Sequence, residues 1–382
     1  MKIRPLLLLA FLTWLSAGCS PAAPATAPSD PTGSAAPSAT APPGSTPTAA
    51  STATSEPTAE PTPTPAPIAF AQPDFVFQGA DPTVPILSRE PSASFNNLYI
   101  NPGGVLFHDG QFHMFFNSFT KWPGLVEIGY AVSPDGYAWQ LAQSQPVITS
   151  AQIPFGENAS DVSSVVVLDD GTWVMYFHTV RDGRIGLATA EDPTGPWTPA
   201  ADPVLTGGPE GVWDEDGVYW PNVVKTGSGF SMYYSGESFS DKAIGLAQSF
   251  DGVNWAKYDD PATTAAEYAE SDPVFVSEGG WDSKRVSRPR VQFTPDGWVM
   301  IYAGAAIDKR GLAISADGIH WDAYPANPIL TQDDFPIPGR KTWDTALLYQ
   351  DGAYFYYMEI GNLSGTDLYL AVHSGLLAGD EP

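Results

Sequence analysis

Three aspartates that lie beside strand-forming runs are the side chains best suited to chemistry. Asp161 lies at the start of the run SDVSSVVV, Asp216 precedes GVYWPNVV, and Asp344 precedes TALLY. Two carboxyl groups that face one substrate can act as a catalytic pair. One donates a proton, and the other accepts a proton or attacks a carbon atom of the substrate. We therefore take Asp161, Asp216 and Asp344 as candidate catalytic residues. Glu237 and Glu359 follow aromatic runs, and we expect them to be rim residues.

A second set of side chains near the same runs has the chemistry of a sugar-binding site. The set combines amide, aromatic, guanidinium and imidazole groups: Asn101, Tyr219, Trp220, Arg288, Arg290 and His178. Aromatic faces stack on the C–H faces of a sugar ring, while guanidinium groups and amides bind its hydroxyls. The sequence predicts a carbohydrate site if the fold brings these residues to one place.

An internal repeat indicates which elements position these residues. The strings DGQFHMFFN, DGTWVMYFH, GSGFSMYYS, DGWVMIYAG and DGAYFYYME each place a tight turn before an alternating aromatic and aliphatic run. Aligning Met114, Met175, Met232, Met300 and Tyr356 gives intervals of 61, 57, 68 and 56 residues. A unit of that length with about four strands is typical of one propeller blade, so the sequence predicts an all-β, five-bladed β-propeller over 68–382.

The last repeat lacks its closing strand, and the sequence upstream of the first repeat supplies a replacement. Four units end in a Pro-aliphatic string, QPVI, DPVL, DPVF and NPIL, whereas the fifth stops short of one. Val84-Pro85-Ile86-Leu87 matches the missing string. We expect this N-terminal strand to complete blade five and close the ring, which removes two open sheet edges.

Two recurring tryptophan patterns are better explained by packing than by ligand binding. Each of the first four repeats carries a turn followed by Trp, at positions 139, 197, 255 and 321, and we interpret these as blade packing. The pair Trp-Asp occurs at 213–214, 281–282 and 343–344. Because it recurs, we favour a structural role for the pair, with Trp buried between blades and Asp capping a turn, over catalysis.

The repeats GLAISADGIHW and NPIL resemble those of the five-bladed glycoside hydrolases, the clan of arabinanases, xylosidases, invertases and levanases in families 43 and 32, with the family 130-like proteins. The resemblance covers most of 80–375 and implies a glycoside hydrolase-like protein with its site at the central cavity. In that clan the inner strands of the early blades supply two Asp and a Glu. Here Asn101 and Tyr219 occupy two of those places, and Asp161 is about two places too early, so a non-catalytic glycan-binding or scaffold propeller remains the rival interpretation.

The N-terminal part of the chain has the pattern of an exported lipoprotein. Lys2 and Arg4 precede a short apolar stretch, and Ser16-Ala17-Gly18 precedes the single cysteine, Cys19. We predict a signal peptide over 1–18, lipidation at Cys19 and a disordered Pro/Thr/Ala/Ser-rich stalk over 19–67. The protein would then be exported and lipid-anchored to the cell membrane or outer membrane, with its domain outside or in the periplasm. An ordinary secretory signal with an incidental cysteine is the alternative.

Charge and composition exclude other classes of function. The formal net charge is −26, and only 16% of the residues are charged, so a nucleic-acid partner is not expected. We expect a monomer that binds a neutral or cationic ligand, with the membrane contacted through the lipid alone. The histidine spacing shows no metal motif. No cofactor is predicted, and a single Ca²⁺ in the channel stays open although no calcium loop is evident.

Overall fold

The computed structural model describes residues 68–121, 124–156, 159–237 and 242–379. The predicted signal peptide, Cys19 and the predicted stalk lie outside these residues. Apart from three short 3-10 helices, Ser150–Gln152, Ala266–Tyr268 and Gln332–Asp334, the regular structure is all β. No helix among the described residues has the length and hydropathy needed to cross a membrane.

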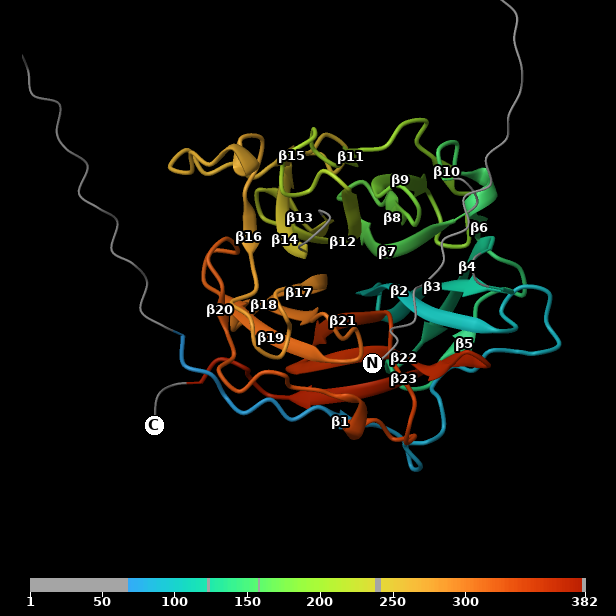
Figure 1. Ribbon diagram of the computed structural model, residues 1–382. Helices are drawn as coiled ribbons and strands as arrows, with labels where there is room; N and C mark the ends of the chain where they lie inside the picture. The colour runs from blue at the N-terminus through green and yellow to red at the C-terminus, as the bar shows by residue number, and fades with distance from the viewer. Residues whose placement is uncertain (1–67, 122–123, 157–158, 238–241, 380–382) are drawn as a thin grey trace, which may run out of the picture. The chain divides into compact units, whose positions relative to one another are not determined.

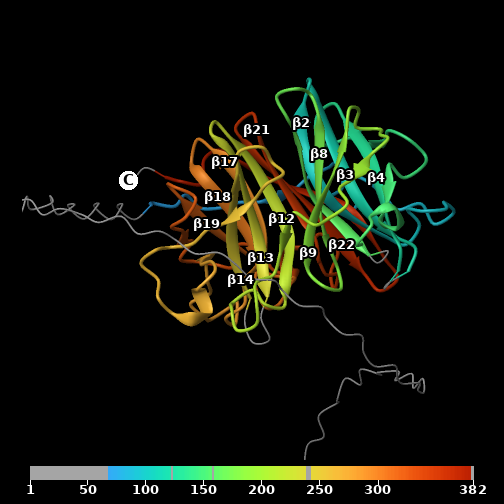
Figure 2. The same ribbon diagram turned by 90° about the horizontal axis from the view of Figure 1, so that it is seen from above.

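Five antiparallel sheets surround a central axis, with the first strand of each repeat innermost (Figure 1). The view turned by 90° shows the strands along their lengths (Figure 2). Blades one and two consist of β2 (Tyr99–His108), β3 (Gln111–Phe119), β4 (Val126–Ser133), β5 (Gln140–Leu141) and β6 (Ile148–Thr149), then β7 (Ser160–Val167), β8 (Trp173–Thr179), β9 (Arg184–Ala190), β10 (Thr198–Pro199) and β11 (Leu205–Thr206).

The remaining three blades follow the same plan. They consist of β12 (Gly217–Thr226), β13 (Gly229–Glu237), β14 (Lys242–Ser249), β15 (Ala256–Lys257) and β16 (Pro273–Phe275); β17 (Ser287–Thr294), β18 (Gly297–Ala303), β19 (Arg310–Ser315) and β20 (Asp322–Ala323); and β21 (Thr345–Gln350), β22 (Ala353–Asn362), β23 (Gly365–Ser374) and β1 (Val76–Phe77). The predicted five-bladed β-propeller is confirmed.

The N-terminal segment closes the ring as predicted. Strand β1 pairs with β23, and Leu87 forms a bridge with Leu368 of the same strand. The Pro-aliphatic strings of the other blades pair at the matching place, for example Ile148 with Ile128 in blade one. Leu87 is buried in the core between blades five and one, so the predicted string occupies the position that the fifth repeat lacks.

The turn after the third strand is held by its own side chains in blades one, three and four. In blade one the Ser133 hydroxyl accepts the N–H of Gly136 at 2.9 Å, and Asp135 Oδ1 accepts the N–H of Tyr137 at 2.9 Å. The same bonds recur at Ser249 and Asp251 and at Ser315 and Asp317. These polar residues therefore fix a turn and leave the ring of the following tryptophan to pack inward.

The turn tryptophans join neighbouring blades, which confirms their predicted packing role. Each ring meets, edge to face, an aromatic ring from the second strand of the preceding blade. The pairs are Trp139 with Tyr357 at 5.6 Å, Trp197 with Phe115 at 5.4 Å, Trp255 with Tyr176 at 5.9 Å and Trp321 with Tyr233 at 5.6 Å. Such edge-to-face pairs add to the free energy gained by burial.

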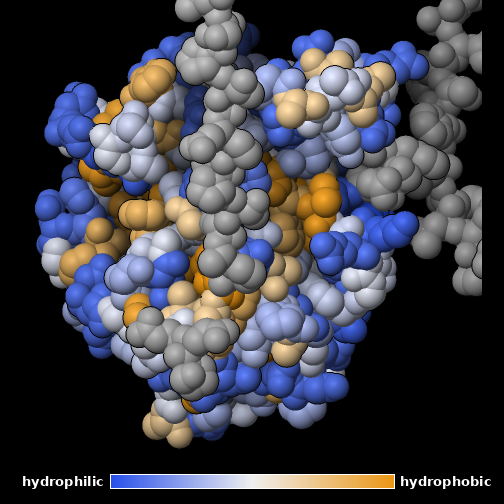
Figure 3. Space-filling model, turned by 90° about the vertical axis from the view of Figure 1, so that its left-hand side faces the viewer, coloured by the Kyte–Doolittle hydropathy of each residue, from blue (hydrophilic) through white to orange (hydrophobic). Residues whose placement is uncertain are grey.

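The surface is mainly polar. On the face drawn in Figure 3, hydrophilic side chains form most of the periphery, and hydrophobic ones are exposed in smaller groups. This fits a chain with a formal net charge of −26, because molecules of like charge repel one another and associate less readily.

Candidate functional site

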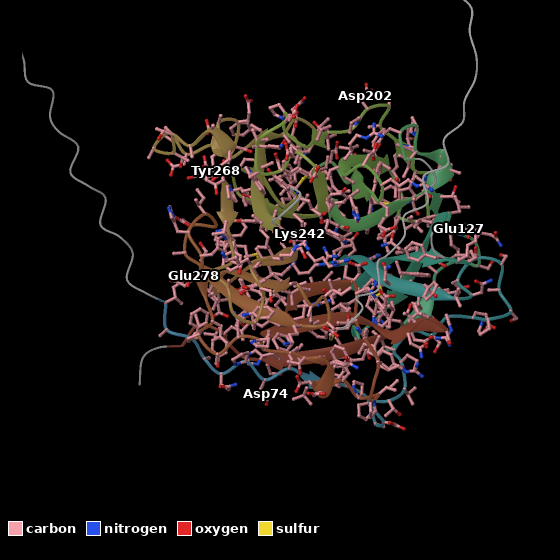
Figure 4. All side chains as sticks on the ribbon, in the orientation of Figure 1. Asp74, Glu127, Asp202, Lys242, Tyr268 and Glu278 are labelled. Carbon is pink, nitrogen blue, oxygen red and sulfur yellow. The ribbon has the colours of Figure 1, made fainter. Side chains whose placement is uncertain are left out.

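A cavity of about 420 Å³ opens where the innermost strands begin, and we call it the site cavity. All five blades contribute side chains to it: Tyr99, Asn101 and Phe119; Asp161, His178 and Val180; Tyr219, Trp220, Glu237 and Lys242; Arg288; Trp343, Asp344, Glu359 and Leu363. In Figure 4 the labelled Lys242 lies towards the centre of the ring, whereas Asp74, Asp202 and Glu278 lie at its periphery.

The strand register explains which residues reach the site cavity. The valines at 105, 165, 223 and 291 pair with the aligned methionines, and Leu347 pairs with Tyr356. Counting back four residues from these positions gives Asn101, Asp161, Tyr219, Ser287 and Trp343, and counting back three gives Pro102, Val162, Trp220, Arg288 and Asp344. Most of the polar and aromatic lining of the cavity comes from these two levels.

This register corrects the position expected for Asp161, which is not two places early, since it occupies the same ladder position as Asn101. Prolines do not mark one level of the inner strands. Trp220 and Arg288, which each precede a proline, are level with Asp344, whereas Asn101, which also precedes a proline, is level with Tyr219. The first four inner strands carry a β-bulge near this point, which hides the equivalence from a comparison of letters alone.

Asp344 is the carboxylate that the site holds in its charged form. Its Oδ1 accepts a hydrogen bond from Nε of Arg288 at 3.0 Å, and the two side chains are 14% and 13% exposed. Burial alone would raise the pKa of Asp344, but the charges of Arg288 and Arg290 outweigh it and hold the pKa below its usual range.

Asp161 has the opposite character. It is 7% exposed, and its buried Oδ1 has no hydrogen-bond partner among the described residues. Burial, reinforced by the charge of Asp344, raises the pKa of Asp161 well above its usual value, against a smaller effect of Arg288. The protonated form of Asp161 is therefore favoured relative to an ordinary aspartate, and the carboxyl group has a free oxygen beside the cavity.

Glu359 is a third carboxyl group of the site, and the expectation that it is a rim residue is wrong. It is 4% exposed, and its Oε2 accepts the backbone N–H of Asp344 at 3.3 Å. Burial, followed by the charge of Asp344, raises the pKa of Glu359 to about 8. Glu359 lies three residues after Tyr356, as His178 lies three after Met175, so the repeat contained a signal for its position.

Trp220 and Arg288 form a rigid stack on one wall. The guanidinium carbon of Arg288 lies 3.9 Å from the centroid of the Trp220 ring, and Nζ of Lys242 lies 5.7 Å from it. Trp220 and Arg288 have φ angles of 48° and 53°, and each precedes a proline. Positive φ is unusual for large side chains, and non-glycine residues held there cluster at functional sites.

Polar and aromatic groups complete the lining. Burial lowers the pKa of His178 to about 3, so its ring is neutral, and it lies 5.1 Å from the Trp220 ring. Burial, followed by the charge of Glu237, raises the pKa of Tyr219 to about 12, so its hydroxyl keeps its proton. Asn101 accepts a hydrogen bond from Asn117 Nδ2 at 2.8 Å through Oδ1.

Two of the candidate residues from the sequence lie elsewhere. Asp216 is exposed and does not line the site cavity. Arg290 is 2% exposed and lines a different cavity at the opposite end of the channel.

The Trp-Asp pairs divide between packing and the site. Trp213 donates to the backbone oxygen of Ser271 at 2.9 Å, and the fully buried Asp214 accepts from Lys257 at 2.5 Å. Asp282 likewise accepts from the hydroxyl of Ser277. Both arrangements are structural, as expected for a recurring pair. Trp343 and Asp344 differ, because both line the site cavity.

No group of three or more His, Cys, Asp or Glu side chains in the described part of the chain has an arrangement that could hold a metal ion.

Comparison with known proteins agrees with the fold. Residues 92–271 match the family model described as Glycosyl hydrolases family 32 N-terminal domain. A search of curated protein sequences found no match. A glycosyl hydrolase from Bacteroides ovatus is similar in structure, with a TM-score of 0.57 and 16% identity over 81% of this chain and 96% of that one.

Two further structures extend the similarity to other families. One belongs to work on the GH130 family of mannoside phosphorylases, which contains glycoside hydrolases that target β-1,2 mannosidic linkages in Candida mannan; its TM-score is 0.57, with 16% identity over 81% of this chain and 97% of that one. The other is a thermostable family-43 glycoside hydrolase, with a TM-score of 0.50 and 14% identity over 77% and 98% of the two chains. The chain is thus similar to glycoside hydrolases of these families in its five-bladed β-propeller fold, and to the family 32 domain over residues 92–271.

Proposed function

We propose that the protein is a glycoside hydrolase that cleaves a glycosidic bond in the site cavity. The observation that carries this proposal is the contrast between Asp161 and Asp344. Burial, reinforced by the charge of Asp344, raises the pKa of Asp161, whereas the nearby arginines hold the pKa of Asp344 below its usual range. Paired carboxyl groups whose pKa values are driven apart are the usual sign of an acid and a base that work together.

The proposed reaction assigns one role to each carboxyl group. Asp161 donates its proton to the glycosidic oxygen as the bond between that oxygen and the anomeric carbon breaks. The Asp344 carboxylate either takes a proton from a water that attacks the anomeric carbon or attacks that carbon itself. Arg288 fixes the orientation of Asp344, and Glu359 holds the backbone N–H of the same residue.

The remaining lining suits a neutral sugar. The charged side chains of Arg288 and Lys242 are paired with Asp344 and Glu237 respectively, so the cavity presents little uncompensated charge. The Trp220 ring offers a stacking surface. Such a platform with hydrogen-bonding groups around it matches the alternating apolar faces and hydroxyl edges of a saccharide.

A panel of glycans tests this proposal. The panel should contain β-1,2-linked manno-oligosaccharides, arabino-, xylo- and fructo-oligosaccharides, and aryl glycosides, with release of reducing sugar as the readout. We expect hydrolysis of at least one class by the wild type, a loss of about 10²- to 10⁴-fold in kcat in Asp344→Asn, and unchanged kcat in Asp216→Asn. The anomer of the first product, followed by ¹H NMR, then distinguishes attack by water from attack by Asp344.

A non-catalytic glycan-binding propeller is the second candidate, and Asn101 favours it. An amide occupies the ladder position at which the clan carries a carboxylate, and an amide can neither accept a proton nor attack carbon. A binder would retain one glycan in a pull-down or calorimetric titration, with no product released over many hours. Asp344→Asn would then change affinity alone.

We also propose that the protein is exported and anchored by a lipid on Cys19, with 19–67 as a stalk. The short apolar stretch followed by small residues and the single cysteine supports this proposal. Cys19→Ser should move the protein from the membrane fraction to the soluble fraction, because one acylated residue would be its sole anchor. Retention of Cys19→Ser in the membrane fraction would contradict it.

A further inference from the structure

A second cavity, of about 270 Å³, lies at the other end of the channel, and we call it the axial cavity. It is lined by the middle and last parts of the five inner strands and shares no lining residue with the site cavity. A Cβ at Gly103 or Gly104 would meet Val162 or Val165 of blade two, so these glycines allow blades one and two to approach closely beside the cavity. Neither the proposed hydrolysis nor the packing of the blades uses it.

The charge of the axial cavity is opposite to that of the chain. No Asp or Glu of the described residues lines it, whereas Arg290 and Lys225 do. The formal net charge of the whole chain is −26, so a cavity with two cations and no carboxylate is unusual for this protein. Lys225, at the exposed end, also pairs with Asp169 at 2.6 Å.

Arg290 is the buried cation of this cavity. It is 2% exposed, its Nε donates to the backbone oxygen of Thr345, and its Nη1 donates to that of Pro289 at 3.4 Å. No carboxylate of the described residues lies within ion-pair distance of it. Burial lowers the pKa of Arg290 to about 10, which still leaves the guanidinium charged at neutral pH. The negative charge of Asp344, which pairs with Arg288, also favours the charged form of Arg290, so the two arginines share one carboxylate.

Neutral hydrogen-bond donors lie around the same space. Oδ1 of Asn222 accepts the N–H of Val291 at 2.7 Å, which fixes the amide and leaves its Nδ2 without a partner among the described residues. The hydroxyl of Ser164 and the amide of Gln292 also line the cavity, but they donate to the backbone oxygens of Val223 and Val291. A buried cation beside an amide donor without a partner is a set of groups that binds an oxyanion.

We propose that the axial cavity binds a small inorganic oxyanion, with Arg290 and the Asn222 amide as its main ligands. The anion adds a negative charge beside Arg290, which otherwise shares that of Asp344 with Arg288. This site is separate from the site cavity, so it can exist whether or not the protein hydrolyses glycosides.

Inorganic phosphate and sulfate are the probes, added to the full chain at constant ionic strength. The expected result is a saturable rise in melting temperature and a saturable calorimetric signal, because a ligand that binds only the folded state stabilises it. Gln292→Glu places a carboxylate in the cavity and should weaken phosphate binding at least tenfold. Gln248→Glu adds the same charge on an exposed strand position and should respond like the wild type.

A second pair of variants keeps the test decisive if Gln292→Glu does not fold. Lys225→Gln removes the exposed cation of the cavity and should weaken binding several-fold, whereas Lys341→Gln removes a cation that lines neither cavity and should have no effect. The proposal is overturned if phosphate and sulfate give no saturable response. It is equally overturned if Gln292→Glu and Lys225→Gln both respond like the wild type.

Discussion

Nε of Arg288 donates a hydrogen bond of 3.0 Å to Asp344 across the boundary between blades four and five. Together with the charge of Arg290, this contact outweighs the effect of burial on Asp344 and lowers its pKa. Burial, reinforced by the negative charge of Asp344, raises the pKa of Asp161 and of Glu359. The pKa values of carboxyl groups in one cavity are thus driven apart, which is the arrangement that acid and base catalysis needs.

Trp220→Ala tests the stacking wall. We expect glycan affinity to fall by about 0.5 to 1.5 kcal/mol, or roughly 2- to 12-fold, because one sugar face loses its aromatic partner. The melting temperature should change little, since Trp220 lines a cavity and is not part of the inter-blade core. Calorimetric titration measures the affinity, and Phe250→Ala, at a 93% exposed position outside the cavity, is the control. Unfolding of Trp220→Ala with unaltered affinity in the folded fraction would mean that Trp220 is a core residue.

Glu359→Gln tests the buried third carboxyl group through pH. An unfolded glutamate ionises near pH 4.3, whereas folded Glu359 keeps its proton up to about pH 8. Between these values the folded state binds more protons, so the wild type loses stability as pH rises. Glutamine cannot ionise, and the stability of Glu359→Gln relative to the wild type should therefore increase from pH 5 to pH 8, by up to about 1.4 kcal/mol per unit.

Chemical denaturation at several pH values measures this effect. The exposed Glu267→Gln is the matched control and should differ from the wild type by a constant amount. If Glu359→Gln and the wild type lose stability in parallel over this range, Glu359 is not the group that titrates.

Leu87→Ala tests closure of the ring. Leu87 is 9% exposed and packs in the core between blades five and one, so its truncation should reduce the free energy of unfolding by about 2 to 5 kcal/mol. Val84, in the same string, is 59% exposed, and Val84→Ala should have little effect. Deletion of 69–90 should expose the edge of blade five and cause aggregation. A truncated domain that melts like the intact one would refute closure by this segment.

The fold could be predicted because the same sequence patterns of turns and strands occur in successive blades of a propeller. Turn residues and alternating strands recur from unit to unit, and the Pro-aliphatic string ends four of the five units. The strand that is missing from the fifth unit could therefore be recognised by comparison with the other four. The incomplete fifth copy and the string at Val84 to Leu87 predicted ring closure for that reason. Local strand patterns and the global topology agree, as they do in sequences that fold to one structure.

The site was harder to predict because it depends on register between blades. The bulges insert residues near the positions that matter, and Trp220 and Arg288 adopt positive φ angles that their types do not suggest. Proline positions therefore do not mark one level, because Asn101 and Trp220 each precede a proline but differ by one ladder position. Burial of Glu359 depends on contacts between distant segments, although its distance from Tyr356 matched that of His178 from Met175.

The most direct test of the account is the dependence of Asp161→Asn on the leaving group. Aryl and alkyl glycosides of the sugar identified by the panel should be compared in wild type and variant. A general acid is needed when the leaving oxygen is basic, so we expect kcat/KM of the variant to fall about 10²- to 10⁴-fold on alkyl glycosides and to stay near the wild-type value on dinitrophenyl glycosides. An equal loss on both substrates, or no loss on either, would contradict the assignment of Asp161 as the proton donor.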